Sequence, residues 1–190
     1  MSKIEVDQID PQSGTTLTLG TSGDTVTIPS GVSLAPGGGL TLTGNFVVDG
    51  GTIKLDGNYP TGTDNVALGD TALDSVEAGG IRNVAIGSKA LTAATTGDAN
   101  VAIGWQALDA LTTSSNNVAV GGNALSANTS GTQNTAVGRE AGQVITTGSC
   151  NTLVGSFTGQ AMTTGSGNTS LGSLTLGALT TGSSNTAIGS

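Results

Sequence analysis

A five-residue motif recurs eight times in this chain of 190 residues, and its almost constant spacing limits the possible folds more than any other feature. The motif reads asparagine, valine or threonine, a usually small residue, an aliphatic residue and glycine. The second copy begins 18 residues after the first, and each later copy follows after 17. We call each repeat a rung and number its positions from the asparagine. Position 1 is held by Asn65, Asn83, Asn100, Asn117, Asn134, Asn151, Asn168 and Asn185, and position 5 by Gly69, Gly87, Gly104, Gly121, Gly138, Gly155, Gly172 and Gly189. Repeats of fixed length are typical of solenoids and related arrays.

The first part of each rung has the character of a short strand. In the third rung, β-branched Val101 and Ile103 flank a small residue, so positions 2 and 4 share one face of the strand. Gly104 then permits a sharp bend. The one extra residue of the first rung falls within residues 77–82, where an outward loop could absorb it.

The second part of each rung predicts another short extended piece and a closing turn. In the third rung the extended piece runs through Ala107 and Leu108 to Leu111, and a Thr-Thr-Gly-Ser type of sequence forms the turn. A rung of this length is too short for a helix, a strand and their connections. The sequence therefore predicts an all-β fold, a β-solenoid of about eight rungs.

The thinness of the rungs predicts an assembly of several chains. A rung can bury about four aliphatic side chains, which is too little to offset the entropy lost when its residues become ordered. Stacking adds hydrogen bonds between rungs, but aromatic residues make up only 2% of the chain. We therefore expect the missing burial to come from identical chains; that there are three of them, in a homotrimer, follows mainly from the family resemblance described below.

The composition excludes most enzyme and metal chemistry. The chain has no histidine, one cysteine (Cys150) and five lysine or arginine residues. It therefore cannot build a Ser-His-Asp triad, a Cys-His pair or a disulfide framework, and we expect no catalytic residue, no metal and no cofactor. The net charge of −8 argues against nucleic acid as a partner. No apolar run is long enough to span a membrane, and the first residues lack the features of a secretory signal, so we expect synthesis in a cytoplasm.

The repeats resemble those of two families of trimeric proteins. The Asn-Val-Ala-Ile-Gly motifs at residues 83–87 and 100–104, and Asn-Thr-Ala-Ile-Gly at residues 185–189, resemble the head repeats of YadA-type trimeric adhesins. The longer form with Ala-Leu and Thr-Thr-Gly is similar to repeats of bacteriophage tail fibres. The resemblance covers residues 65–190 and implies a left-handed parallel β-roll in each of three chains packed about one axis.

The first third of the chain follows a different pattern. Short alternating triplets separated by Gly, Ser, Asp or Pro predict very short strands, which would be stable only when interleaved between three chains. The opening resembles the start of tail-fibre-like virion proteins of marine phages, which implies attachment to the particle. We expect residues 1–30 to attach to the virion through Ile4, Val6, Ile9 and Pro11, residues 31–60 to form a trimeric shaft, and residues 61–190 to form the β-roll. Because the chain ends directly after the eighth motif, we also expect the natural protein to continue.

Several columns of the repeat allow a functional or a structural interpretation. The asparagines could bind sugars. The better hypothesis is an internal ladder of amide side chains, which hydrogen-bonds to the backbone groups of the turns. Adjacent threonines resemble the hydroxyl rows of ice-binding solenoids, although adjacent side chains should point to opposite faces. The scattered acids Asp70, Asp74, Asp98 and Asp109 fit solvated loops better than calcium sites. We expect Trp105 on the outer surface, where it is an ordinary exposed residue or a contact with a virion protein, and Cys150 as a spectator thiol in a turn.

Together these observations predict a non-enzymatic structural protein of a tailed phage virion. It would be a trimeric tail fibre, made in the host cytoplasm, with its N-terminus on the tail, adaptor or baseplate and a distal part on a host surface receptor. No nucleic acid and no membrane insertion are expected. The alternatives are the head of a bacterial trimeric surface adhesin and, as a minor possibility, an ice-binding β-solenoid.

Overall fold

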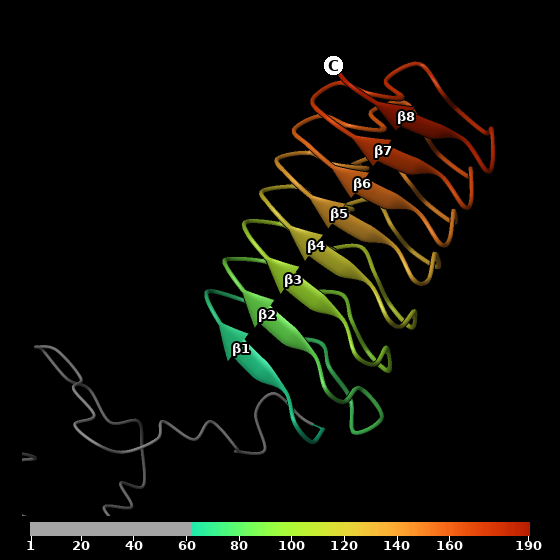
Figure 1. Cartoon of the computed structure of the whole chain (residues 1–190). Coiled ribbons are helices and arrows are strands. Elements are labelled where there is room, and N and C mark those ends of the chain that lie inside the picture. Colours follow the sequence, from blue (N-terminus) through green and yellow to red (C-terminus); the bar gives the residue numbers. More distant parts are fainter. Residues whose placement is uncertain (1–61) are drawn as a thin grey trace, which may run out of the picture. The chain divides into compact units, whose positions relative to one another are not determined.

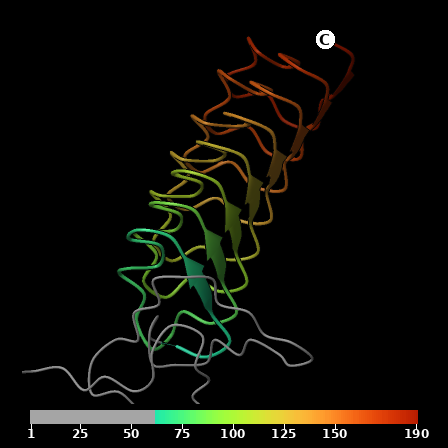
Figure 2. The ribbon, with the colours of Figure 1, turned by 90° about the vertical axis from the view of Figure 1, so that its left-hand side faces the viewer.

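A computed structural model describes residues 62–190, which form a parallel β-solenoid (Figure 1). Its eight strands each contain three residues and lie in one sheet in sequence order, all parallel. The strands are β1 (Val66–Leu68), β2 (Val84–Ile86), β3 (Val101–Ile103), β4 (Val118–Val120), β5 (Thr135–Val137), β6 (Thr152–Val154), β7 (Thr169–Leu171) and β8 (Thr186–Ile188). The predicted all-β solenoid with a 17-residue repeat is confirmed. The turned view shows the strands stacked along one side of the solenoid (Figure 2).

The expected N-terminal parts lie outside the described residues. These are the attachment segment 1–30, with Ile4, Val6, Ile9 and Pro11, and the shaft 31–60. The handedness and the trimer implied by the family resemblance also stay predictions at this point. Residues 62–190 contain no helix, and so none that could cross a membrane.

The rungs stack in perfect register. Val101 of β3 pairs with Val84 of β2 and with Val118 of β4, and the same alignment continues through all eight strands. Hydrogen bonds between rungs also continue outside the strands, as from Leu108 N to Ala124 O at 3.1 Å. The extra residue of the first rung lies in an exposed loop at residues 77–79, so the prediction that a loop absorbs it is confirmed.

The prediction of a second extended piece in each rung is wrong. Residues 104–111 form two successive turns, in which Ala107 N donates to Gly104 O at 3.3 Å and Leu111 N to Leu108 O at 3.2 Å. Leu108 has a φ of 52°, in the left-handed region, whereas a strand needs φ near −120°. A chain that returns to its starting edge within 17 residues needs sharp corners, and the left-handed residues supply them.

Three positions of the rung adopt this left-handed conformation again and again. They are position 7, position 9 and position 17, where a non-glycine residue with positive φ is uncommon in proteins. At position 7 these residues are Thr71, Lys89, Gln106, Asn123, Glu140, Phe157 and Leu174. At position 9 they are Leu73, Leu91, Leu108, Leu125 and Leu176. At the last position, directly before each asparagine, they are Asp64, Arg82, Ala99, Asn116, Gln133, Cys150 and Ser184. Each corner costs roughly 1 kcal/mol relative to glycine, so the coil stores strain that the stack must offset.

Glycine at one of these corners should therefore stabilise the protein. Ala99 has a φ of 54°, and the equivalent position 17 of the sixth rung holds Gly167, with a φ of 70°. We expect Ala99→Gly to raise the free energy of unfolding by about 0.5–1 kcal/mol, since it removes the steric strain at the cost of a more flexible unfolded chain. Urea denaturation would measure the change. Ala102→Gly, within β3, is the control and should destabilise instead; destabilisation by Ala99→Gly would contradict the strain argument.

The interior of the solenoid is narrow and filled mostly by small side chains. In the third rung Ala102, Ala107, Leu108 and Leu111 are fully buried. The strand residue that points inward is therefore the small one at position 3, while positions 2 and 4 point outward. The chain's own core thus receives the smallest side chain of every strand except β6, where position 3 is Leu153.

One part of the core exchanges large and small residues between two positions. Position 3 holds Leu153 in place of alanine, and position 9 holds Gly142 and Gly159 in place of leucine. A Cβ atom added to Gly142 would lie 2.7 Å from Leu153 Cδ1, and one added to Gly159 would lie 3.4 Å from it. The leucine therefore extends into the space that the two glycines leave, which keeps the core filled at this level.

A hydroxyl cluster replaces alanine methyl groups further along the core. The buried side chains of Thr158 and Ser170 are 2.6 Å apart, and Ser170 Oγ lies 2.5 Å from Thr175 Oγ1. Thr175 Oγ1 also donates to Gly172 O at 2.8 Å. Since each hydroxyl has a partner in the cluster, the polar substitution leaves no unbonded group in the core.

Candidate functional site

The asparagines at position 1 form an internal column that joins successive rungs. Asn117 Oδ1 accepts a hydrogen bond from Asn134 N at 3.0 Å, while Asn117 Nδ2 donates to Gly131 O at 3.0 Å. The same pair of contacts recurs along the stack, for example at Asn83 with Asn100 N and Gly97 O. Each side chain thereby closes the turn that leads into the next rung. Six of the eight asparagines are fully buried: Asn83, Asn100, Asn117, Asn134, Asn151 and Asn168.

The amides also bond to one another along the column. Asn100 Nδ2 donates to Asn83 Oδ1 at 3.1 Å, and Asn151 Nδ2 donates to Asn134 Oδ1 at 3.0 Å. Buried amides whose oxygen and nitrogen are both bonded inside the chain are not presented to a ligand. The column therefore has the geometry of an internal ladder and not of a sugar-binding surface.

The glycines at position 5 form a second column, in which the backbones of successive rungs come very close. All eight have a φ between 129° and 139°, a conformation open to glycine almost alone. A Cβ atom on Gly104 would lie 2.6 Å from both the carbonyl carbon and the oxygen of Gly121. Position 5 therefore admits no side chain in a stacked rung.

A third column, at position 16, carries a side-chain ladder that the sequence alone did not reveal. Asp98 N donates to Ser115 Oγ at 2.9 Å, and Ser149 N donates to Ser166 Oγ at 3.0 Å. Asp98 Oδ1 serves in the same way, accepting from Ile81 N at 3.0 Å. The signal was present as a run of serine, threonine and aspartate in this column, but such residues are equally common in plain turns.

The adjacent threonines at positions 13 and 14 differ in the use of their hydroxyls. At position 13 the hydroxyl is used inside the stack, as where Thr95 Oγ1 donates to Thr112 O at 3.2 Å. At position 14 Thr96 and Thr113 are exposed. Only the hydroxyls at position 14 are therefore not bonded between rungs, and a single such row does not give the flat two-dimensional array that an ice-binding interpretation of these pairs would need.

The acidic side chains do not gather into a site. Asp70 and Asp74 are exposed in the first rung, and Asp98 serves the ladder at position 16. Burial raises the pKa of the Asp109 carboxyl above its ordinary value, against the opposing hydrogen bond from Gln106 at 3.2 Å. Within residues 62–190, no three His, Cys, Asp or Glu side chains lie together in a group that could hold a metal ion.

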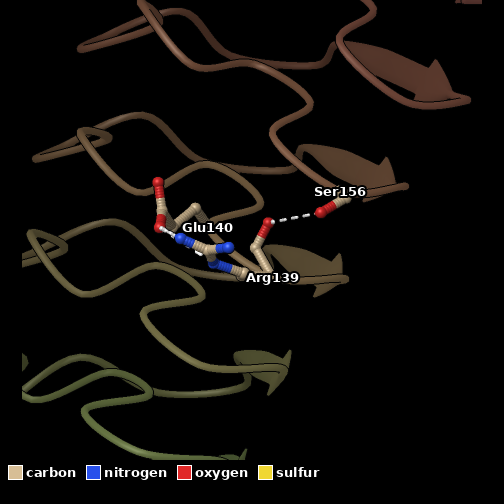
Figure 3. Close-up of polar contacts among 3 residues, drawn as sticks. All are labelled: Arg139, Glu140 and Ser156. Carbon is tan, nitrogen blue, oxygen red and sulfur yellow. Dashed lines mark hydrogen bonds and ion pairs between the residues drawn. The ribbon is translucent and has the colours of Figure 1, made fainter.

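The few large or reactive side chains lie on the outside. Trp105 is 54% exposed, which confirms its predicted surface position, and the free thiol of Cys150 is exposed. The guanidinium of Arg139 contacts Glu140 at 2.9 Å and lies 5.0 Å from the ring centre of Phe157. Figure 3 shows this ion pair beside Ser156, whose hydroxyl donates to Arg139 O at 3.4 Å. Arg139 is therefore engaged by its own chain.

The most unusual surface is the outward face of the strands, which we call the outer strand face. It consists of positions 2 and 4 of the eight rungs, and all sixteen of these residues are Val, Leu, Ile or Thr. Position 4 is the more exposed, with Leu68 at 49%, Ile86 and Ile103 at 36%, Val137 at 37%, Leu171 at 48% and Ile188 at 74%. Eight strands spaced about 4.8 Å apart extend this face over about 34 Å.

An uncharged aliphatic sheet face open to water is rare on a monomer. Contiguous apolar patches on soluble proteins mark places where another molecule binds, and the centres of protein interfaces are depleted of charge. The outer strand face is therefore the candidate functional site of the described residues. Comparison of the chain with protein-family models, with curated proteins and with solved structures found no match.

Proposed function

We propose that the chain is a non-enzymatic structural protein that assembles into a homotrimer through the outer strand face. The observation that carries this proposal is the row of aliphatic side chains at position 4, six of them exposed and two half-buried, with no charge at either outward position of any strand. A second copy of the chain offers the same long, straight, apolar surface with the same repeat, so it is a partner of matching shape and chemistry.

The narrow core supports the same conclusion. Two of the four core side chains in the third rung are alanines, while the larger Val101 and Ile103 face outward. Burial of these larger side chains between chains would add the hydrophobic stabilisation that the interior of one chain supplies only sparingly. A trimer places three such faces around one axis and leaves none of them in water.

We further propose that this trimer is a tail fibre of a tailed phage. The proposal rests on the resemblance of the repeats and of the first residues to phage fibre proteins. The fibre would hold a host-recognition part away from the particle, with the N-terminus on the virion. The main alternative is the head of a trimeric adhesin on a bacterial surface, which would use the same assembly.

The mass of the native particle tests the assembly. We expect light scattering to give three times the 18.3 kDa of one chain. Ile103→Asp should raise the protein concentration at which the trimer half-dissociates at least about 100-fold, because each interface would bury an unpaired charge. The control Thr113→Asp changes an exposed residue outside the outer strand face and should leave the trimer intact. A wild-type monomer, or equal effects of the two variants, would contradict the proposal.

The location of the protein tests the virion assignment separately. Antibodies raised against residues 62–190 should label fibres on purified phage particles in electron micrographs. Labelling of bacterial cell surfaces in the absence of particles would instead support the adhesin. Either result leaves the test of the trimer unaffected.

A further inference from the structure

We infer that the outer strand face has two halves of different strength: rungs 1–4 hold the copies together through an apolar contact, and rungs 5–8 form a weaker, hydroxyl-lined contact. The inference rests on the proposed trimer and specifies which part of the chain maintains it.

The two halves differ at one column only. Position 4 stays aliphatic from the first rung to the last, whereas position 2 changes abruptly from valine to threonine between β4 and β5. Valine and threonine have nearly the same shape, so the change replaces a methyl group by a hydroxyl without altering the outline of the face. Position 2 is held by Val66, Val84, Val101 and Val118, and then by Thr135, Thr152, Thr169 and Thr186.

The threonine hydroxyls of the second half have no hydrogen-bond partner among the described residues. None of the four threonine hydroxyls at position 2 makes a hydrogen bond to another of residues 62–190, and Thr152, Thr169 and Thr186 are exposed. A hydroxyl buried against a neighbour without a partner costs free energy, so this half must retain water or bond across the interface. In the first half the four valines are half-buried, and their complete burial breaks no hydrogen bond because their side chains are apolar.

The distribution of charge also differs between the two halves. Residues 64–109 contain six acidic and two basic side chains, a net charge of −4, whereas rungs 5–8 contain only the ion pair of Arg139 and Glu140. Copies packed side by side would therefore repel one another along rungs 1–3 and not along rungs 5–8. Three of the four valines lie in these charged rungs, so the apolar contact there has to offset the repulsion.

A matched exchange of valine and threonine tests the inference. One variant carries Val101→Thr and Val118→Thr, and the other carries Thr135→Val and Thr152→Val. The concentration at which the trimer half-dissociates is measured by sedimentation. We expect the first variant to raise it at least about 100-fold, because six hydroxyls per trimer enter an apolar contact, and the second to lower it at least about 10-fold.

A measurement on the unchanged protein keeps the test valid if a variant folds poorly. Hydroxyl-radical footprinting above and below the dissociation concentration should show stronger protection of aliphatic side chains in rungs 1–4 than in rungs 5–8. Equal protection of the two halves, or equal effects of the two exchanges in a stable trimer, would overturn this inference and leave the trimer standing. A monomeric wild type would overturn both.

Discussion

Replacing Gly104 by alanine should lower the free energy of unfolding by about 4 kcal/mol. The new Cβ atom would lie 2.6 Å from backbone atoms of Gly121, which cannot move without separating the rungs. In addition, the residue would have to hold a φ of 133°, which costs an L-amino acid of order 1–3 kcal/mol, and overpacking costs about as much again. Chemical denaturation at a fixed protein concentration would measure the loss.

The neighbouring position provides the control. A Cβ atom on Gly122 would meet nothing closer than Trp105 O at 3.9 Å, and Gly122 is not among the glycines with positive φ. Gly122→Ala should therefore change the free energy of unfolding by no more than about 0.5 kcal/mol. Similar losses for the two variants would show that position 5 is not specially constrained.

Replacing Asn117 by aspartate should cost about 3–5 kcal/mol at pH 7. The two side chains have the same shape, but a carboxylate cannot donate to Gly131 O or to Asn100 Oδ1, which Asn117 Nδ2 contacts at 3.0 and 3.2 Å. The substitution would place an unpaired charge in a fully buried column. The exposed neighbour offers a matched variant, Asn116→Asp, which should cost no more than about 0.5 kcal/mol.

The cost of Asn117→Asp should depend on pH. Burial raises the pKa of the introduced carboxyl in the folded protein above its unfolded value of about 3.9. Below about pH 4 the carboxyl is neutral in both states and can donate to Gly131 O, so the cost is small. As the pH rises the unfolded state ionises first, and the loss of stability grows until the folded carboxyl ionises as well. A cost independent of pH between 3 and 7 would show that the column is open to water.

The repeat predicted the architecture well because the pattern itself determines it. The constant spacing of the asparagines required stacked rungs of equal length, and the alternation of Val101 and Ile103 with a small residue placed positions 2 and 4 on one face. Alternation cannot tell which face lies inside, however. In this solenoid the small residue points inward, and the larger side chains are left on the outer surface.

Other features could not be predicted from residue types. Leucine is unfavourable in the left-handed region, so nothing in the sequence indicated a turn at Leu108. The tight coil forces this conformation, and the contacts of the stack stabilise it. Similarly, serine at position 16 is a common turn residue, and its role as an acceptor for the preceding rung depends on a neighbour 17 residues away, as between Asp98 N and Ser115 Oγ.

The exchange of volume between Leu153 and the glycines at Gly142 and Gly159 bears on how the chain finds its alignment during folding. Near-identical repeats invite a misfolded form in which one whole repeat loops out and its neighbours close the gap. A leucine moved one repeat toward the N-terminus would meet Leu125 where it now meets Gly142, and the crowded core would cost of order 1–3 kcal/mol. The irregular repeat thus disfavours the misaligned form and gives the stack one preferred alignment.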